Sequence, residues 1–199
     1  KQFKTIAIAG THGKTTTTSL VTHILKTAGI NCFAFLGGIS QNYNTNLILG
    51  DANDSEAYVV VEADEYDRSF LTLHPFISVI TSVDADHLDI YGDAAHIEAS
   101  FREFAAKTDR DHLYVIKGLP LDGITIGVTP DADFSAQNIR IENGYYVFDV
   151  KTPNEVVQNV KETAAPMMDK AEEYVIEAKD KFSETFEAAK KKVNAFVNE

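Results

Sequence analysis

Short runs of apolar residues recur along most of the chain, and polar or glycine-containing segments separate them. Runs of four or five residues that are rich in Val and Ile are typical of strands buried on both faces of a parallel sheet. We identify such runs at residues 5–9, 32–36, 58–62, 76–80, 113–116 and 124–128. The pattern therefore predicts a sheet assembled from these strands.

Two other segments repeat apolar residues every three or four positions, which predicts amphipathic helices. The first begins at Lys14, ends at Gly29, and carries Leu20, Val21, Ile24, Leu25 and Ala28. The second covers residues 94–107, with Ile97, Phe101, Phe104 and Ala105 on one face. Alternating strands and helices predict an α/β fold, in which helices flank a mostly parallel sheet.

The chain beyond residue 130 has a different pattern. Residues 134–141 and 145–150 flank Asn143-Gly144, a strong signal for a tight hairpin, so a small antiparallel piece is expected at the end of the sheet. Closer to the start, we expect a turn at Gly37-Gly38 and a loop over residues 41–53, which are rich in Asn and Gly.

The last part of the chain carries another apolar repeat, from about Val160 to Asn198. It predicts one amphipathic helix of about 30 residues, on the order of 45 Å long. We therefore expect one domain over residues 1–155 and a helical appendage over residues 156–199. The apolar stripe of that helix is expected to dock on the domain or to pair with a second copy of the chain.

Charge and composition exclude several classes of function. A formal net charge of −12 over 199 residues disfavours nucleic acid as a partner. A single cysteine, Cys32, excludes an internal disulfide and suits a reducing cytoplasm. No run is long and apolar enough to span a bilayer, and no secretory signal is visible, so we expect a cytoplasmic protein without a membrane partner.

The segment between the first strand and the first helix has the composition of a phosphate-binding loop. It reads Gly10-Thr11-His12-Gly13-Lys14-Thr15-Thr16. Such a turn directs backbone N–H groups and the positive end of the helix dipole at one spot. Lys14 is expected to reach the β- and γ-phosphates of a nucleotide and the Thr15 hydroxyl to bind Mg²⁺, although Ile8 stands where the usual first glycine would be.

Carboxylates follow the strand at residues 58–62. Glu62 ends that strand, and ligands bind at the carboxyl ends of strands in open α/β sheets, so we expect Glu62 to hold Mg²⁺. We expect Asp64, Glu65 and Asp67 to form a solvated acidic turn.

A histidine follows the strand at residues 76–80. His87 lies in the segment Asp84-Ala85-Asp86-His87-Leu88-Asp89, which points to the same sheet edge. Histidine is a poor Mg²⁺ ligand, so a second metal or a substrate group is expected there.

These three motifs, in this order, resemble the central ATPase domain of the Mur ligases, which build the peptide stem of bacterial cell-wall precursors. The resemblance covers roughly residues 4–154. It implies ATP and Mg²⁺ as cofactors, Lys14 as the phosphate-binding lysine, Thr15 and Glu62 as metal ligands, and His87 as the ligand of a second metal. The family reaction it implies activates a carboxylate as an acyl phosphate, which an amine then converts to an amide.

His12 and the segment Glu62-Ala63-Asp64-Glu65 favour the family branch that joins L-alanine to UDP-N-acetylmuramate. A recycling branch that joins an intact tripeptide to the same sugar nucleotide shares both features and is the alternative. Complete members have three domains, so we expect this chain to hold the central one and not to ligate alone. Two readings outside the family remain: a non-catalytic assembly module that binds nucleotides, and a small phosphate-loop kinase or hydrolase.

Overall fold

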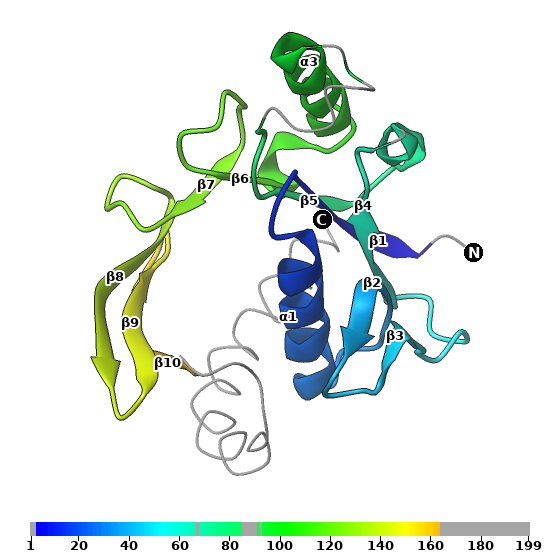
Figure 1. Ribbon diagram of the computed structural model, residues 1–199. Coiled ribbons are helices and arrows are strands. Elements are labelled where there is room, and N and C mark those ends of the chain that lie inside the picture. The colour runs from blue at the N-terminus through cyan, green and yellow to red at the C-terminus, as the bar shows by residue number, and fades with distance from the viewer. Residues whose placement is uncertain (1–2, 67, 85–90, 92, 164–199) are drawn as a thin grey trace.

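The structure is a computed structural model that describes residues 3–66, 68–84, 91 and 93–163. These residues form one ten-stranded sheet in the order β10-β9-β8-β7-β6-β5-β1-β4-β2-β3 (Figure 1). Its strands are β1 Lys4–Ala9, β2 Cys32–Ser40, β3 Thr45–Ile48, β4 Tyr58–Ala63, β5 Ile77–Ile80, β6 Leu113–Ile116, β7 Ile124–Gly127, β8 Phe134–Glu142, β9 Tyr145–Lys151 and β10 Val156–Thr163. The described helices are α1 Lys14–Thr27 and α3 Ala94–Ala105, with 3-10 turns at Ser69–Thr72 and Arg110–His112.

Seven strands that are neighbours in the sheet, in the order β2-β4-β1-β5-β6-β7-β8, run parallel to one another, which confirms the predicted α/β class. β1 lies inside this parallel part, between β4 and β5. Its last residue, Ala9, is level with Ala63 of β4 and Ile80 of β5. The loops that leave these three strands therefore begin at the same edge of the sheet.

The two helices cover opposite faces of the sheet, because alternate residues of β1 enter different cores. Ile6 and Ile8 pack in a cluster that contacts Val21 and Leu25 of α1. Ala7 and Ala9 belong instead to a cluster with side chains of α3, chiefly Ile97, Phe101 and Phe104. Neither helix is long and apolar enough to span a bilayer, and the described residues contain no other candidate.

α1 forms where the apolar repeat predicts it, but its buried face is different from the one expected. Thr18 and Thr22 are fully buried, whereas Leu20 and Ile24 are 40% and 43% exposed. The threonine hydroxyls donate to the carbonyl oxygens of Lys14 and Thr18, one helical turn earlier. Threonine can therefore pack its methyl group against the sheet without burying an unpaired polar atom.

The predictions for residues 37–53 are wrong at Gly37-Gly38 and at residues 45–48. Gly37 and Gly38 do not form a turn but continue β2, and the expected loop contains β3, which pairs antiparallel with β2. β3 is the last strand at its end of the sheet, so it needs pairing partners on one side only. A polar, Asn-containing sequence can satisfy that requirement.

The predicted hairpin is confirmed, and the sheet continues beyond it. Asn143 and Gly144 have φ values of 52° and 81°, as a two-residue turn of type I′ requires. β10 then pairs with β9, so residues 156–163 form a strand where we expected the helical appendage to begin. The β-branched residues Val156, Val157 and Val160 favour this strand. The helix predicted further along lies in residues 164–199, outside the described residues.

Candidate functional site

The candidate site lies where the loops that follow β1, β4 and β5 meet. All three leave the carboxyl ends of neighbouring parallel strands, and the order of the strands changes direction around β1. The ligands of open α/β sheets bind at this kind of position. The first motif begins in the loop after β1, the second runs from the end of β4 into the loop that follows, and Asp84 begins the third in the loop after β5; residues 85–89 lie outside the described residues.

The loop from Gly10 to Gly13 packs closely on the loop after β5. Gly10 has a φ of 138°, and a Cβ atom there would lie 2.2 Å from Thr81 Oγ1. Only glycine therefore fits at this position. Gly13 has a φ of 84° and directs the chain into α1, whose first backbone hydrogen bond joins Thr17 N to Gly13 O. The backbone amides of Lys14, Thr15 and Thr16 precede that bond, so they belong to the free amides of a helix start.

Hydroxyl groups after β5 fix the loop, and the sequence analysis missed them. Ser82 Oγ accepts a hydrogen bond from His12 N at 2.8 Å and lies 2.8 Å from Thr11 Oγ1. Thr81 Oγ1 donates to His12 O. A Thr-Ser pair directly after a buried strand was the available signal. The His12 imidazole is 3.8 Å from Asp84 Oδ2, and both side chains are largely exposed, so this pair contributes little.

Lys14 lies over the loop and forms an ion pair. Its ammonium donates to Gly10 O at 2.7 Å and to Glu65 Oε2 and Oε1 at 2.7 and 3.0 Å. The expectation of a solvated turn is wrong for Glu65, whose side chain is 1% exposed. Asp64 is exposed, and its carboxylate accepts a hydrogen bond from Tyr66 N. Asp67 lies outside the described residues.

The loop that carries Glu65 is tied to α3 through Tyr91 and Arg68. The Tyr91 hydroxyl donates to Glu65 O, and burial raises the pKa of that phenol, which keeps it protonated. The Arg68 guanidinium lies 5.3 Å from the centre of the Tyr91 ring and donates to Ser100 Oγ in α3 at 2.8 Å. These contacts hold Glu65 in a fixed position.

The side-chain oxygens of Thr15 and Glu62 lie side by side. Thr15 Oγ1 donates to Glu62 Oε2 at 3.0 Å, and Gly37 N donates to Glu62 Oε1. A Cβ atom on Gly37 would lie 2.5 Å from Glu62 Oε2, so a glycine is needed in β2 for the carboxylate to approach.

This donor set fits a hard divalent cation. Mg²⁺ usually takes one or two protein carboxylates and completes its shell with water and phosphate oxygens. Within the described ranges, no group of three His, Cys, Asp or Glu side chains is placed to bind a metal. His87, the predicted ligand of a second metal, lies outside those ranges.

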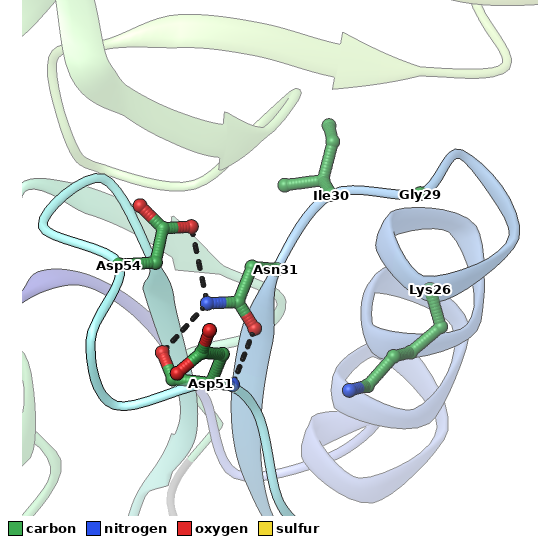
Figure 2. Close-up of a pocket in the computed structure, with 6 residues that line it drawn as sticks. All are labelled: Lys26, Gly29, Ile30, Asn31, Asp51 and Asp54. Carbon is green, nitrogen blue, oxygen red and sulfur yellow. Dashed lines mark hydrogen bonds between the residues drawn. The ribbon is translucent and has the colours of Figure 1, made fainter.

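A second polar cluster lies at the other end of α1, around a shallow pocket of about 360 Å³ (Figure 2). The Asn31 amide group donates to Asp51 O and Asp54 Oδ2, and its oxygen accepts from Asp51 N. Lys26 Nζ donates to Leu49 O at 3.0 Å. These bonds join the end of α1 and the start of β2 to the segment between β3 and β4.

Comparisons with known proteins agree on one family. A family model described as the Mur ligase middle domain matches residues 8–161. The UDP-N-acetylmuramate–L-alanine ligase of Flavobacterium psychrophilum is 59% identical over 157 residues, which cover 78% of this chain and 34% of that protein. The enzyme of the same name from Christiangramia forsetii is 57% identical over 157 residues, with the same coverage. This chain spans about a third of the length of these curated relatives.

Solved structures show the same architecture. The UDP-N-acetylmuramate–alanine ligase of Thermotoga maritima aligns with a TM-score of 0.68 at 25% identity, over 82% of this chain and 37% of that one. A ligase from Neisseria meningitides that joins L-alanyl-γ-D-glutamyl-meso-diaminopimelate to UDP-N-acetylmuramate aligns with a TM-score of 0.64 at 24% identity, over 76% of this chain and 53% of that one. The similarity to the Neisseria meningitides ligase shows only that the two chains share a fold.

Proposed function

The chain belongs to the Mur ligase family, whose middle domain it contains, and we propose that it is the ATP-binding domain of a UDP-N-acetylmuramate–L-alanine ligase. One observation carries this proposal: Lys14 and the Thr15–Glu62 pair lie at the same helix start. The lysine and the helix amides attract phosphate, while the hydroxyl and the carboxylate suit Mg²⁺. MgATP is the ligand that needs both kinds of group together.

Each of these residues has a defined part in the proposed site. Lys14 and the first amides of α1 bind and orient the β- and γ-phosphates. Thr15 and Glu62 hold Mg²⁺, and Gly37 N keeps the Glu62 carboxylate turned toward Thr15. The metal, when bound, neutralises charge on the phosphates. Phosphoryl transfer depends on such positioning and charge neutralisation more than on a covalent catalyst.

For the complete enzyme, we propose the reaction that the family and the named relatives indicate. The carboxylate of UDP-N-acetylmuramate attacks the γ-phosphorus of ATP, and ADP leaves, giving an acyl phosphate. The amine of L-alanine then attacks the acyl carbon, and inorganic phosphate leaves as the amide forms. The role of His87 at a second metal beside the reacting carboxylate rests on the sequence motif.

The curated relatives support the L-alanine branch. The two relatives named for L-alanine addition are 59% and 57% identical to this chain. We also propose a cytoplasmic location, because ATP is the cosubstrate and Cys32 is a buried free thiol.

A domain exchange tests the proposal. Residues 8–161 replace the corresponding middle domain of the Flavobacterium psychrophilum ligase, and mass spectrometry follows product formation from UDP-N-acetylmuramate, MgATP and L-alanine or the tripeptide. We expect the L-alanine product, and we expect none when Lys14→Met is added to the chimera. A folded chimera that does not convert L-alanine would contradict the proposal. The 199-residue chain alone should turn over far below the ordinary enzyme range of about 1–10³ per second.

A further inference from the structure

The Lys14 ammonium is surrounded by acceptors that belong to the protein itself. An ammonium group has three N–H donors. Among the described residues, three oxygens lie within hydrogen-bond distance of Nζ: Gly10 O and both carboxylate oxygens of Glu65, at 2.7 to 3.0 Å. A phosphate oxygen can therefore bond to Lys14 only if one of these contacts is given up.

Glu65 is built into this position. Its carboxylate is almost fully buried, and burying a carboxylate is costly unless a cation stays beside it. Its backbone carbonyl is held by the Tyr91 hydroxyl, and Tyr91 is itself 6% exposed and lies against Arg68. A shift of Glu65 away from Lys14 would disturb that whole arrangement, so the Lys14–Glu65 pair is a fixed part of the site.

We propose that Glu65 is an internal anion that competes with phosphate for Lys14. In the empty site it positions the lysine over the loop from Gly10 to Gly13, and it lowers the affinity for polyphosphates. When a polyphosphate binds, its oxygens take over part of the Lys14 donors while Glu65 keeps the rest. The identification of that polyphosphate as the nucleotide rests on the proposed function; the competition itself does not.

The test is the substitution Glu65→Gln, which removes the charge and keeps the shape of the side chain. Titration calorimetry at fixed ionic strength measures binding of inorganic tripolyphosphate and of a non-hydrolysable ATP analogue. We expect Glu65→Gln to bind tripolyphosphate on the order of tenfold more tightly than the wild type, because a hydrogen bond between charged groups no longer has to be broken. A gain in affinity cannot arise from a loosened fold.

Glu56→Gln is the matched control. It removes the same charge from an ion pair with Lys4 in which Glu56 is 68% exposed, and it lies at the other end of β4. We expect its affinity for tripolyphosphate to equal that of the wild type. Tyr91→Phe provides a second route if Glu65→Gln does not fold. Because it removes the hydroxyl that holds Glu65 O, it should raise affinity in the same direction by about threefold.

Unchanged or weaker binding of tripolyphosphate in Glu65→Gln would overturn the inference, as would an equal gain in Glu56→Gln. If tripolyphosphate binds more tightly while no variant binds the ATP analogue, the competition stands and the proposed function fails. If the wild type binds the ATP analogue and Glu65→Gln shows no gain with either ligand, the proposed function stands and the competition fails.

Discussion

Two lysines lie at the two ends of α1, and the helix dipole has opposite effects on their charges. Lys26 is in the last turn, where the helix dipole favours a positive charge. Lys14 is the first residue of the helix, where the dipole disfavours a positive charge and favours an anion. The charge of Lys26 therefore stabilises the fold. The charge of Lys14 destabilises the helix start, and a bound anion would offset that destabilisation.

The groups that surround the two lysines also differ. Around Lys26, backbone groups and the Asn31 amide satisfy one another at the surface (Figure 2). Around Lys14, the buried Glu65 carboxylate supplies the compensating charge, and Thr15 of α1 hydrogen-bonds to Glu62 of β4 nearby. The comparison indicates which lysine suits a ligand site: the one whose charge opposes the local field of the helix, so that an anion can bind beside it.

The largest expected effect on affinity comes from removing the charge of Lys14, and the same change at Lys26 is the control. We expect Lys14→Met to weaken binding of the ATP analogue at least about 100-fold, because more than one charge-assisted bond is lost. Lys26→Met should stay within about twofold of the wild type, since an exposed surface contact contributes little. Titration calorimetry measures both affinities.

Lys14→Met also removes a partner of the buried Glu65 carboxylate, so its stability needs a separate control. Breaking a buried pair from one side costs about 3–5 kcal/mol, whereas replacing both members costs less. The double variant Lys14→Met with Glu65→Gln should therefore recover thermal stability without recovering affinity. Affinity like that of the wild type in a folded Lys14→Met protein would refute the assignment of the phosphate site.

A smaller effect is expected from the glycines of β2. In Gly37→Ala, the new Cβ would meet the Glu62 carboxylate at 2.5 to 2.8 Å, so the carboxylate must move away from Thr15. We expect about tenfold weaker binding of the ATP analogue in the presence of Mg²⁺. Gly38→Ala is the neighbouring control, because its Cβ would meet only Thr15 Cγ2, at an ordinary 3.9 Å. Equal behaviour of the two variants would show that Glu62 placement does not matter.

The smallest effect on the ligand is expected at the second cluster. Asn31→Ala should lower the free energy of unfolding by about 2 kcal/mol, since its amide joins the start of β2 to Asp51 and Asp54. Denaturant unfolding gives this value. The affinity for the ATP analogue should not change, and a change of tenfold or more would mean that the two ends of α1 are coupled.

Local pattern was enough to predict most of the sheet and the loop that leads into α1. Runs of β-branched residues marked the parallel strands, Asn143-Gly144 marked the hairpin, and Gly10 to Thr16 marked the helix start with its loop. The family suggested by the three motifs is confirmed by the match over residues 8–161. These features depend on neighbours in the chain, which a sequence displays directly.

The missed features depend on contacts between distant residues. Glu65 looks like part of an acidic turn until the fold brings Lys14, 51 positions earlier, within 2.7 Å. Gly37 looks like a turn residue until the Glu62 carboxylate is placed against it. The burial of Thr18 and Thr22 in place of Leu20 and Ile24 follows from how α1 is rotated on the sheet. The roles of Thr15, Glu62 and His87 toward metal stay predictions.

The Mg²⁺ dependence of nucleotide binding tests the central claim most directly. The claim is that the start of α1 binds a nucleotide through Lys14 and its metal through Thr15 and Glu62. The measurement is the dissociation constant of a non-hydrolysable ATP analogue, with and without Mg²⁺, for the wild type and for Glu62→Gln. We predict that Mg²⁺ tightens binding to the wild type, and that Glu62→Gln loses most of this gain while its metal-free affinity is retained. An equal loss of affinity with and without Mg²⁺ would contradict the account, because Glu62 would then not be a metal ligand.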